Sequence, residues 1–108
     1  MSTPAPRPKA TKRRSGQRFE ILNAFVDGGM AELTRAELAV WLILYRDTKT
    51  NGTAQTSLED LALRGGMDRQ TASRAVGKLK KRKMLRVVNR GGLNKGPSVY
   101  QAFPYPME

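Results

Sequence analysis

The sequence predicts an α+β fold that is mainly helical, with a β-hairpin close to the C-terminus. Three observations predict it. Apolar residues recur at helical spacing through most of the chain, Gly-Gly pairs and N-cap residues divide that pattern into separate helices, and two stretches rich in Val, Tyr and Phe flank a glycine-rich loop near the end. The length of 108 residues is enough for one small domain.

Residues 1–16 contain three prolines, a Lys-Arg-Arg run and almost no bulky apolar side chain. Such a segment cannot bury enough apolar surface to offset the entropy lost on ordering. We therefore expect a disordered basic arm. A short helix is expected over residues 17–26, where apolar residues return at helical spacing, and the pair Gly28-Gly29 is expected to end it.

Thr34 and Glu37 have the spacing of a capping box, in which the hydroxyl covers the third amide of the helix and the carboxylate reaches back. A helix is therefore expected to begin after Thr34 and to run to about Arg46. It is apolar on most sides, which predicts a central helix or one buried against a partner. Trp41, in its middle, is expected to be a core residue.

Residues 53–55 are interpreted as a very short strand that follows a polar loop. Thr56 and Glu59 repeat the spacing of a capping box and predict that another helix begins after Thr56. The pair Gly65-Gly66 is expected to end this helix.

The next helix is expected over residues 69–82, with Asp68 as its N-cap. Its outward positions are mostly basic or hydroxyl-bearing. Its inward positions form one apolar stripe of four small or branched residues: Ala72, Ala75, Val76 and Leu79.

Residues 85–89 and 99–103 are rich in Val, Tyr and Phe and are predicted to be two strands. The segment between them is basic and rich in glycine, so the strands are expected to form a hairpin with a flexible tip. We expect one domain over residues 17–103, followed by a short C-terminal tail over residues 104–108.

The net charge of +11 is distributed unevenly along the chain. Residues 1–18 carry a net charge of +6, residues 19–63 carry −4 and residues 64–95 carry +10. Basic charge concentrated on one tail, one helix and one hairpin is the electrostatic signature of a protein that binds a polyanion.

The chain has no cysteine and no histidine. Their absence removes the usual zinc ligands, the most common general base and the Cys/His nucleophile pairs. We expect no metal, no cofactor and no enzymatic activity. No run of 18 apolar residues is present, so no membrane span is expected, and a cytoplasmic, nucleoid-associated protein is the expectation.

From about Leu33 to Ala102 the chain resembles the winged helix-turn-helix family of bacterial, plasmid and phage regulators and replication proteins. The pieces that carry the resemblance are LTRAELAVWLIL, TSLEDLALRGGMDRQTASRAVGKLKKRKML and SVYQA, in this order. The resemblance implies a three-helix core with a hairpin wing, here with an extra N-terminal helix. It also implies that helix 69–82 enters the major groove of double-stranded DNA and that residues 89–98 lie on the adjacent backbone or minor groove.

The sequence departs from the family pattern at two positions in or beside the recognition helix. Lys83 stands where many members have a glycine that ends this helix. Gly77 lies in the middle of the helix, where a glycine costs about 1 kcal/mol relative to alanine. Close approach of the wing strand, close approach of a phosphate, and simple tolerance all remain open as reasons for Gly77.

The first turns of the recognition helix carry the residues expected to contact DNA most directly. Arg69, Gln70 and Arg74 are candidates to read base edges, because Arg pairs bidentately with guanine and Gln with adenine. Thr71 and Ser73 are short hydroxyl donors suited to phosphate oxygens.

Further candidates are expected to contact the DNA backbone without reading sequence. Lys78 and Lys81 lie one and two turns beyond the base-reading residues. In the wing, Arg90, Asn94 and Lys95 are candidates for the neighbouring minor groove or its phosphates.

In the arm, Arg13 and Arg14 are candidates for the minor groove. A solubilising tail is the alternative for the arm. For the charge run at residues 80–83, a solvated helix end is an equally good interpretation.

The leading hypothesis is a sequence-specific double-stranded DNA-binding protein, either a small transcriptional regulator or a plasmid or phage replication-control protein. The alternative is a protein–protein assembly module of a replication or segregation complex with secondary, non-specific DNA binding. RNA binding is disfavoured because most aromatic residues are expected in the core. A homodimer is favoured by the amount of apolar surface on the first two helices, although packing of these helices on each other would also account for it.

Overall fold

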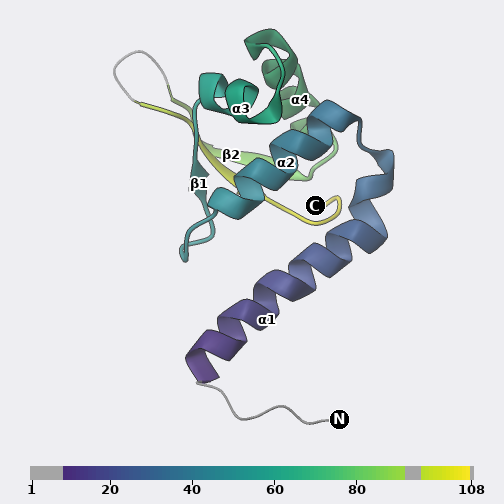
Figure 1. The fold of residues 1–108 in the computed structure, drawn as a ribbon, viewed down its shortest axis with the longest axis vertical. Helices are drawn as coiled ribbons and strands as arrows, with labels where there is room; N and C mark the ends of the chain where they lie inside the picture. The colour runs from purple at the N-terminus through teal and green to yellow at the C-terminus, as the bar shows by residue number, and fades with distance from the viewer. Residues whose placement is uncertain (1–8, 92–95, 108) are drawn as a thin grey trace.

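The computed structural model of the protein describes residues 9–91 and 96–107, and its side chains from Gly16 onward. These residues form a mainly helical α+β fold with a three-stranded antiparallel sheet of strand order β1-β3-β2 (Figure 1). This arrangement is compatible with a winged helix. In chain order the elements are α1 (Lys9–Ala24), the π-helical turn η1 (Phe25–Gly29), the 3-10 turn η2 (Met30–Glu32), α2 (Arg35–Asp47), β1 (Ala54–Gln55), α3 (Leu58–Gly65), α4 (Arg69–Lys81), β2 (Leu85–Asn89) and β3 (Val99–Ala102).

The helix α2 is central, as expected. The capping box at its start is present: the Thr34 hydroxyl accepts a hydrogen bond of 3.2 Å from the Glu37 amide, and the Glu37 carboxylate accepts one of 3.4 Å from the Thr34 amide. Trp41 is fully buried in the core. Its ring stacks on Phe25 with centroids 3.7 Å apart, and its indole N–H donates to the Phe103 carbonyl at 2.8 Å. Trp41 therefore joins η1, α2 and the end of the sheet.

The N-terminal helix is longer than the sequence pattern predicted. It begins at Lys9 rather than Gln17, so residues 9–16 are helical instead of part of a disordered arm, while residues 1–8 lie outside the described residues. The prediction considered only how little apolar surface this segment could bury. Its Lys, Ala, Thr and Arg residues include strong helix formers.

The glycine pair at residues 28–29 does not end the first helical segment as expected. The chain continues through η1 into η2. Gly29 is buried, and a Cβ atom there would lie 2.4 Å from the Pro104 carbonyl oxygen and 2.5 Å from the Met84 Cε atom. Gly29 therefore serves to let the C-terminal segment approach the backbone closely, not to terminate a helix.

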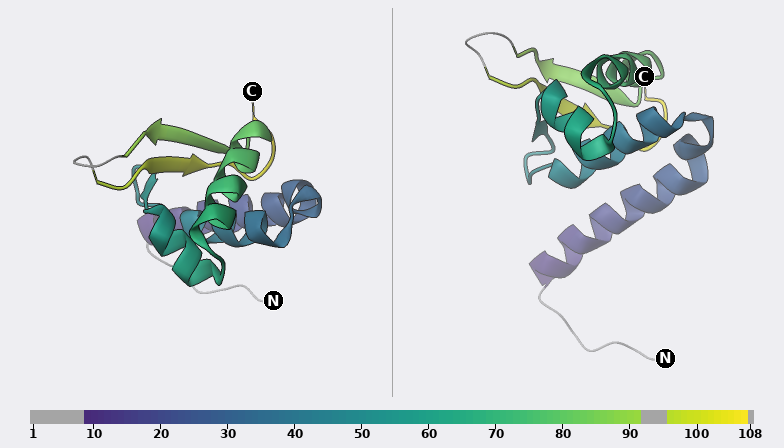
Figure 2. Two further views of the ribbon diagram at one scale, coloured as in Figure 1. Left: turned by 90° about the horizontal axis from the view of Figure 1, so that it is seen from above. Right: turned by 45° about the horizontal axis from the view of Figure 1, so that its top comes forward.

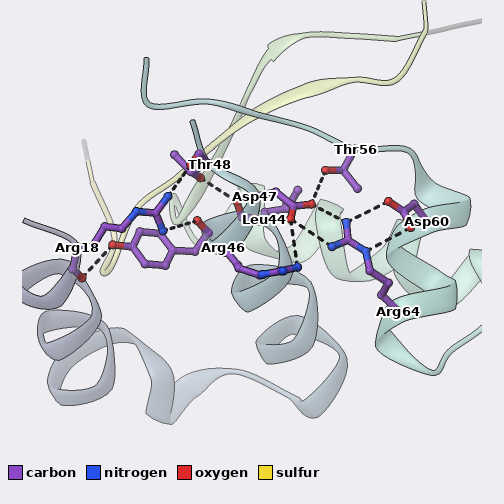
Figure 3. Close-up of polar contacts among 9 residues, drawn as sticks. Arg18, Leu44, Arg46, Asp47, Thr48, Thr56, Asp60 and Arg64 are labelled. Carbon is purple, nitrogen blue, oxygen red and sulfur yellow. Dashed lines mark hydrogen bonds and ion pairs between the residues drawn. The ribbon is translucent and has the colours of Figure 1, made fainter. Parts of the chain in front are cut away.

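The helix α1 lies on the side of α2 opposite to α3 and α4 (Figures 1 and 2). Arg18 connects it to the end of α2. The Arg18 guanidinium donates to the Thr48 carbonyl and lies 5.2 Å from the centroid of the Tyr45 ring, while the Tyr45 hydroxyl donates to the Arg18 carbonyl at 2.9 Å (Figure 3). Burial raises the pKa of Tyr45, and the Arg18 charge partly offsets this rise.

The predicted capping box of α3 is absent, because the helix begins one residue later. Ser57 is the N-cap and accepts a hydrogen bond of 3.1 Å from the Asp60 amide. Thr56 directly follows β1, and its amide donates to the Ser98 carbonyl at 3.2 Å. Its hydroxyl donates to the Asp47 carboxylate instead. The strand pairing thus displaces the cap, and Glu59 is left outside any capping box.

An ion-pair cluster holds α3 against the end of α2 (Figure 3). The Arg64 guanidinium donates two hydrogen bonds to the Asp47 carboxylate, the longer of which is 3.2 Å. It donates two more to the Asp60 carboxylate, at 3.0 Å and 3.2 Å. The hydrogen bond from Arg64 is the main reason that the pKa of Asp47 is lowered. This cluster fixes α3 relative to the core.

Left-handed residues follow both α3 and α4. Gly66 (φ 67°) ends α3, with the Met67 amide donating to the Ala62 carbonyl at 2.9 Å. Lys83 (φ 64°) plays the same part after α4, with the Met84 amide donating to the Leu79 carbonyl at 3.0 Å. Both patterns are Schellman motifs, which usually place glycine at the left-handed position. The Lys83 departure seen in the sequence is therefore a real conformational cost.

The hairpin closely matches the expected strands: β2 spans the predicted residues 85–89, and β3 ends one residue early, at Ala102. β2 pairs with β3 from Leu85 opposite Ala102 to Asn89 opposite Val99, with a bulge between Val87 and Asn89. The short strand β1 adds to the other edge of β3. Beyond the strands, the Gly91 amide donates to the Ser98 hydroxyl at 2.8 Å, which closes the base of the wing.

Candidate nucleic-acid interface

The helix α4 presents one continuous polar face away from the core. Its four inward residues, Ala72, Ala75, Val76 and Leu79, are buried as predicted. Gln70, Arg74 and Lys81 follow one another at spacings of four and seven residues, so they lie along one line of the helix opposite this stripe. The side chains of all three are exposed. Between Arg69 and Lys81 the helix has five basic residues and no acidic one.

The start of α4 is held by Asp68, whose carboxylate accepts a hydrogen bond of 2.7 Å from the Thr71 amide. This bond is the main reason that the pKa of Asp68 is lowered, and the Arg74 charge adds to the effect. Thr71 is half-buried while Ser73 is exposed. The cap leaves the first turn of α4 regular, so its outward residues keep a fixed direction.

Arg69 has a partner that the sequence pattern did not suggest. Its guanidinium lies 3.7 Å from the Glu59 carboxylate, and both side chains are largely exposed. The pairing follows from the displaced cap of α3, since Glu59 would otherwise have turned back towards the N-cap residue. An anion that approaches Arg69 therefore also meets the negative charge of Glu59.

The first turn of α4 and the base of the wing share one hollow of about 500 Å³. Glu59 on α3 and Arg69 on α4 line it from one side, and Gly91, Pro97 and Ser98 line it from the hairpin. Figure 2 shows the β2–β3 hairpin extending to one side of α3 and α4. The structure thus brings the predicted base-reading end of α4 next to the wing base.

The structure describes some of the remaining candidate DNA-contacting residues and not others. Arg90 is exposed directly after β2. Asn94 and Lys95 lie outside the described residues. Arg13 and Arg14 belong to the helix α1 rather than to a disordered arm, and their side chains are outside the described part of the chain.

The basic residues of the charge run at residues 80–83 differ in their surroundings. Lys78, Lys80 and Lys81 are exposed on α4. Arg82, in contrast, donates to the buried Glu37 carboxylate at 2.9 Å. The interpretation of this run as a solvated helix end therefore does not apply to Arg82, because its guanidinium forms an ion pair within the fold.

A second, open hollow of about 800 Å³ lies along the C-terminal half of α4. Gly77 and five basic residues line it; the basic residues are Arg74, Lys78, Lys80, Lys81 and Arg82. This surface continues the line of Gln70 and Arg74 towards the helix end. The C-terminal half of α4 therefore offers positive charge to a long anionic ligand, whereas in the hollow beside the wing Glu59 offsets the charge of Arg69.

Among residues 9–91 and 96–107, no group of three or more His, Cys, Asp or Glu residues is placed to hold a metal ion. The same residues include no helix that is both long and apolar enough to cross a membrane.

Comparison with known proteins finds likenesses among solved structures. No family model matches the chain, and no curated protein matches it. A solved structure of BpsR from Bordetella bronchiseptica is similar to it over 94% of this chain and 70% of that chain, with a TM-score of 0.47 and 20% sequence identity. That structure concerns the mechanism by which 6-hydroxynicotinic acid regulates the DNA binding of BpsR.

Proposed function

We propose that this protein is a non-catalytic, winged-helix binder of double-stranded DNA that recognises a specific sequence. The observation that carries the proposal is the outward line of Gln70, Arg74 and Lys81 on α4, a helix with five basic residues and no acid, beside the base of the wing. A major groove about 12 Å wide accepts one such helix. A small transcriptional regulator or a replication-control protein is the role that we assign to it.

In this proposal the N-terminal half of α4 reads bases and the C-terminal half positions the helix. Arg69, Gln70 and Arg74 face base edges, where each bidentate pair contributes roughly 1–3 kcal/mol of discrimination. Lys78 and Lys81 meet phosphates and fix the register without reading sequence. The wing, through Arg90, contacts the neighbouring backbone or minor groove.

Exposed apolar groups outside this face favour a second candidate, a protein–protein assembly module. Phe19 on α1 is 67% exposed and Val26 on η1 is 50% exposed. Both precede α2, far along the chain from the basic face of α4. A homodimer formed through this surface is compatible with the first candidate as well, because two copies would match inverted half-sites about 34–36 Å apart.

The test is a selection of random 30-base-pair duplexes on the purified protein at about 150 mM salt, followed by fluorescence anisotropy on the winner and on a scrambled control. A motif bound at least about a thousandfold more tightly than the control supports sequence-specific binding, and inverted symmetry in the motif supports the homodimer. Binding without a recovered motif, lost steeply as salt rises, favours the assembly module.

A further inference from the structure

The middle of the outward face of α4 carries a glycine, Gly77. It follows Gln70 by seven residues and Arg74 by three, and it precedes Lys81 by four, so it lies on the same face as these side chains. A glycine inside a helix lowers its stability relative to alanine. The position therefore needs a reason, because an alanine would give a more stable helix.

The reasons for a glycine that lie within the protein do not apply to this one. Gly77 is not at a positive φ angle, unlike Gly52, Gly66 and Gly96. A Cβ atom built on Gly77 meets nothing within 4 Å among the described residues, whereas one on Gly29 or Gly91 would clash with backbone atoms. The β2–β3 hairpin, as far as it is described, thus does not press against α4 at this point.

The surroundings of Gly77 indicate what approaches from outside. The hollow along α4 has Gly77 in its lining, and Arg74, Lys78, Lys80 and Lys81 form most of the rest. The missing side chain leaves the helix backbone open between cationic groups. An anionic chain can lie closer to the helix axis here than at any position that carries a Cβ atom, while the flanking ammonium and guanidinium groups reach around it.

We infer that Gly77 is a close-approach position for the sugar–phosphate backbone of DNA, one that sets how deeply α4 sits in the groove. The inference rests on the proposed DNA-binding function. It adds a residue, Gly77, that positions the helix on DNA because it has no side chain. It predicts a conflict between stability and binding: filling the position should stabilise the protein and weaken its complex with DNA. Because the contact is with the backbone, every sequence should be affected alike.

The experiment compares Gly77→Ala with Gly16→Ala, each measured by thermal unfolding and by anisotropy on the selected and scrambled duplexes. Gly16 is a matched control, since it also lies inside a helix, α1, and an added Cβ there likewise meets nothing within 4 Å. We expect Gly77→Ala to raise Tm by about 2–6 °C. We expect it to weaken binding to both duplexes about tenfold, as an added methyl group at a close contact does.

Gly16→Ala should leave both affinities unchanged. Gly77→Leu, which also introduces a strong helix former but a larger side chain, should weaken binding further than Gly77→Ala.

If the wild-type protein binds DNA and Gly77→Ala binds as tightly, the inference is wrong and the proposed function stands. A loss confined to the selected duplex also overturns it, because the glycine would then face bases and not the backbone. If the wild-type protein binds neither duplex, the proposed function itself fails, and the inference fails with it.

Discussion

The Glu37 carboxylate at the start of α2 accepts a hydrogen bond of 2.9 Å from the Arg82 guanidinium at the end of α4. The Glu37 side chain is 2% exposed and that of Arg82 is 31% exposed, so the anion is buried and the cation is half-buried. Glu37 also accepts from the Thr34 amide. One carboxylate therefore caps the central helix and anchors the helix that carries the candidate DNA-binding face.

We expect Arg82→Ala to destabilise the protein by about 2–3 kcal/mol, because it leaves the buried Glu37 carboxylate without its charged partner. Urea unfolding measures this difference. Lys81→Ala is the control: its side chain is exposed, so the change should be within about 0.5 kcal/mol. Equal effects of the two substitutions would show that the ion pair does not stabilise the fold.

This pair also shows why the sequence predicted some features and not others. The starts of α2 and α4 could be predicted because Thr34 and Asp68 are local N-cap signals that act within one helical turn. The pair of Glu37 and Arg82 joins residues 45 positions apart. The sequence pattern assigned Glu37 only to a capping box and Arg82 only to a charge run, since nothing local distinguishes a buried ion pair from either.

The start of α3 illustrates a local signal that a distant contact overrides. Thr56 has the residue type and spacing of an N-cap, yet its amide pairs with Ser98, 42 residues later in the chain, and its hydroxyl donates to Asp47 instead of capping α3. The candidate face on α4 was predictable because it depends only on helical spacing. The partnership of Arg69 with Glu59 was not, because it depends on where α3 begins.

A substitution at Lys83 is expected to raise the stability of the protein. Its left-handed φ of 64° costs an L-residue with a side chain roughly 1 kcal/mol relative to glycine. We expect Lys83→Gly to stabilise the protein by about that amount in urea unfolding. Lys80→Gly, within α4, should instead destabilise it by about 1 kcal/mol. If both substitutions destabilise the protein, the left-handed end of α4 is not populated in solution.

The carboxylate of Asp47 predicts a loss of stability in acid. Its hydrogen bond from Arg64 lowers its pKa in the folded protein below the value of about 3.9 in the unfolded chain. Since the folded pKa is the lower one, the stabilisation is fully present above the unfolded value and disappears as pH falls through the folded value. We expect the stability difference between wild type and Asp47→Asn to be constant from pH 7 to 5 and to shrink below about pH 4.

Urea unfolding of both proteins across this range measures the effect. Asp27→Asn is a control, since Asp27 is exposed and takes part in none of the ion pairs among the described residues. A difference for Asp47→Asn that persists unchanged at pH 3 would mean that Asp47 acts by packing and not by charge.

Glu59 is expected to restrain DNA binding. It neutralises Arg69 at 3.7 Å and adds a negative charge to the hollow beside the wing. Because an exposed ion pair is worth about 0.2–1 kcal/mol, we expect Glu59→Gln to tighten binding to selected and scrambled DNA by up to about fivefold, with a smaller gain at high salt. If Glu59→Gln instead weakens binding and changes the selected motif, Glu59 itself reads a base, as a carboxylate does with the cytosine amino group.

The division of α4 into reading and positioning residues is tested by comparing Arg74→Ala with Lys78→Ala. The two side chains are both exposed and lie one turn apart, but Lys78, eight residues beyond Gln70, lies further round the helix from Gln70 than Arg74 does. We expect Arg74→Ala to lower the ratio of specific to non-specific affinity, at a cost of about 1–3 kcal/mol on the selected duplex. Lys78→Ala should weaken both duplexes similarly and reduce the slope of log K against log salt by about one. Anisotropy titrations at several salt concentrations separate the two effects. If both variants lose the same affinity for the selected and the scrambled duplex, α4 binds the DNA backbone without reading its sequence.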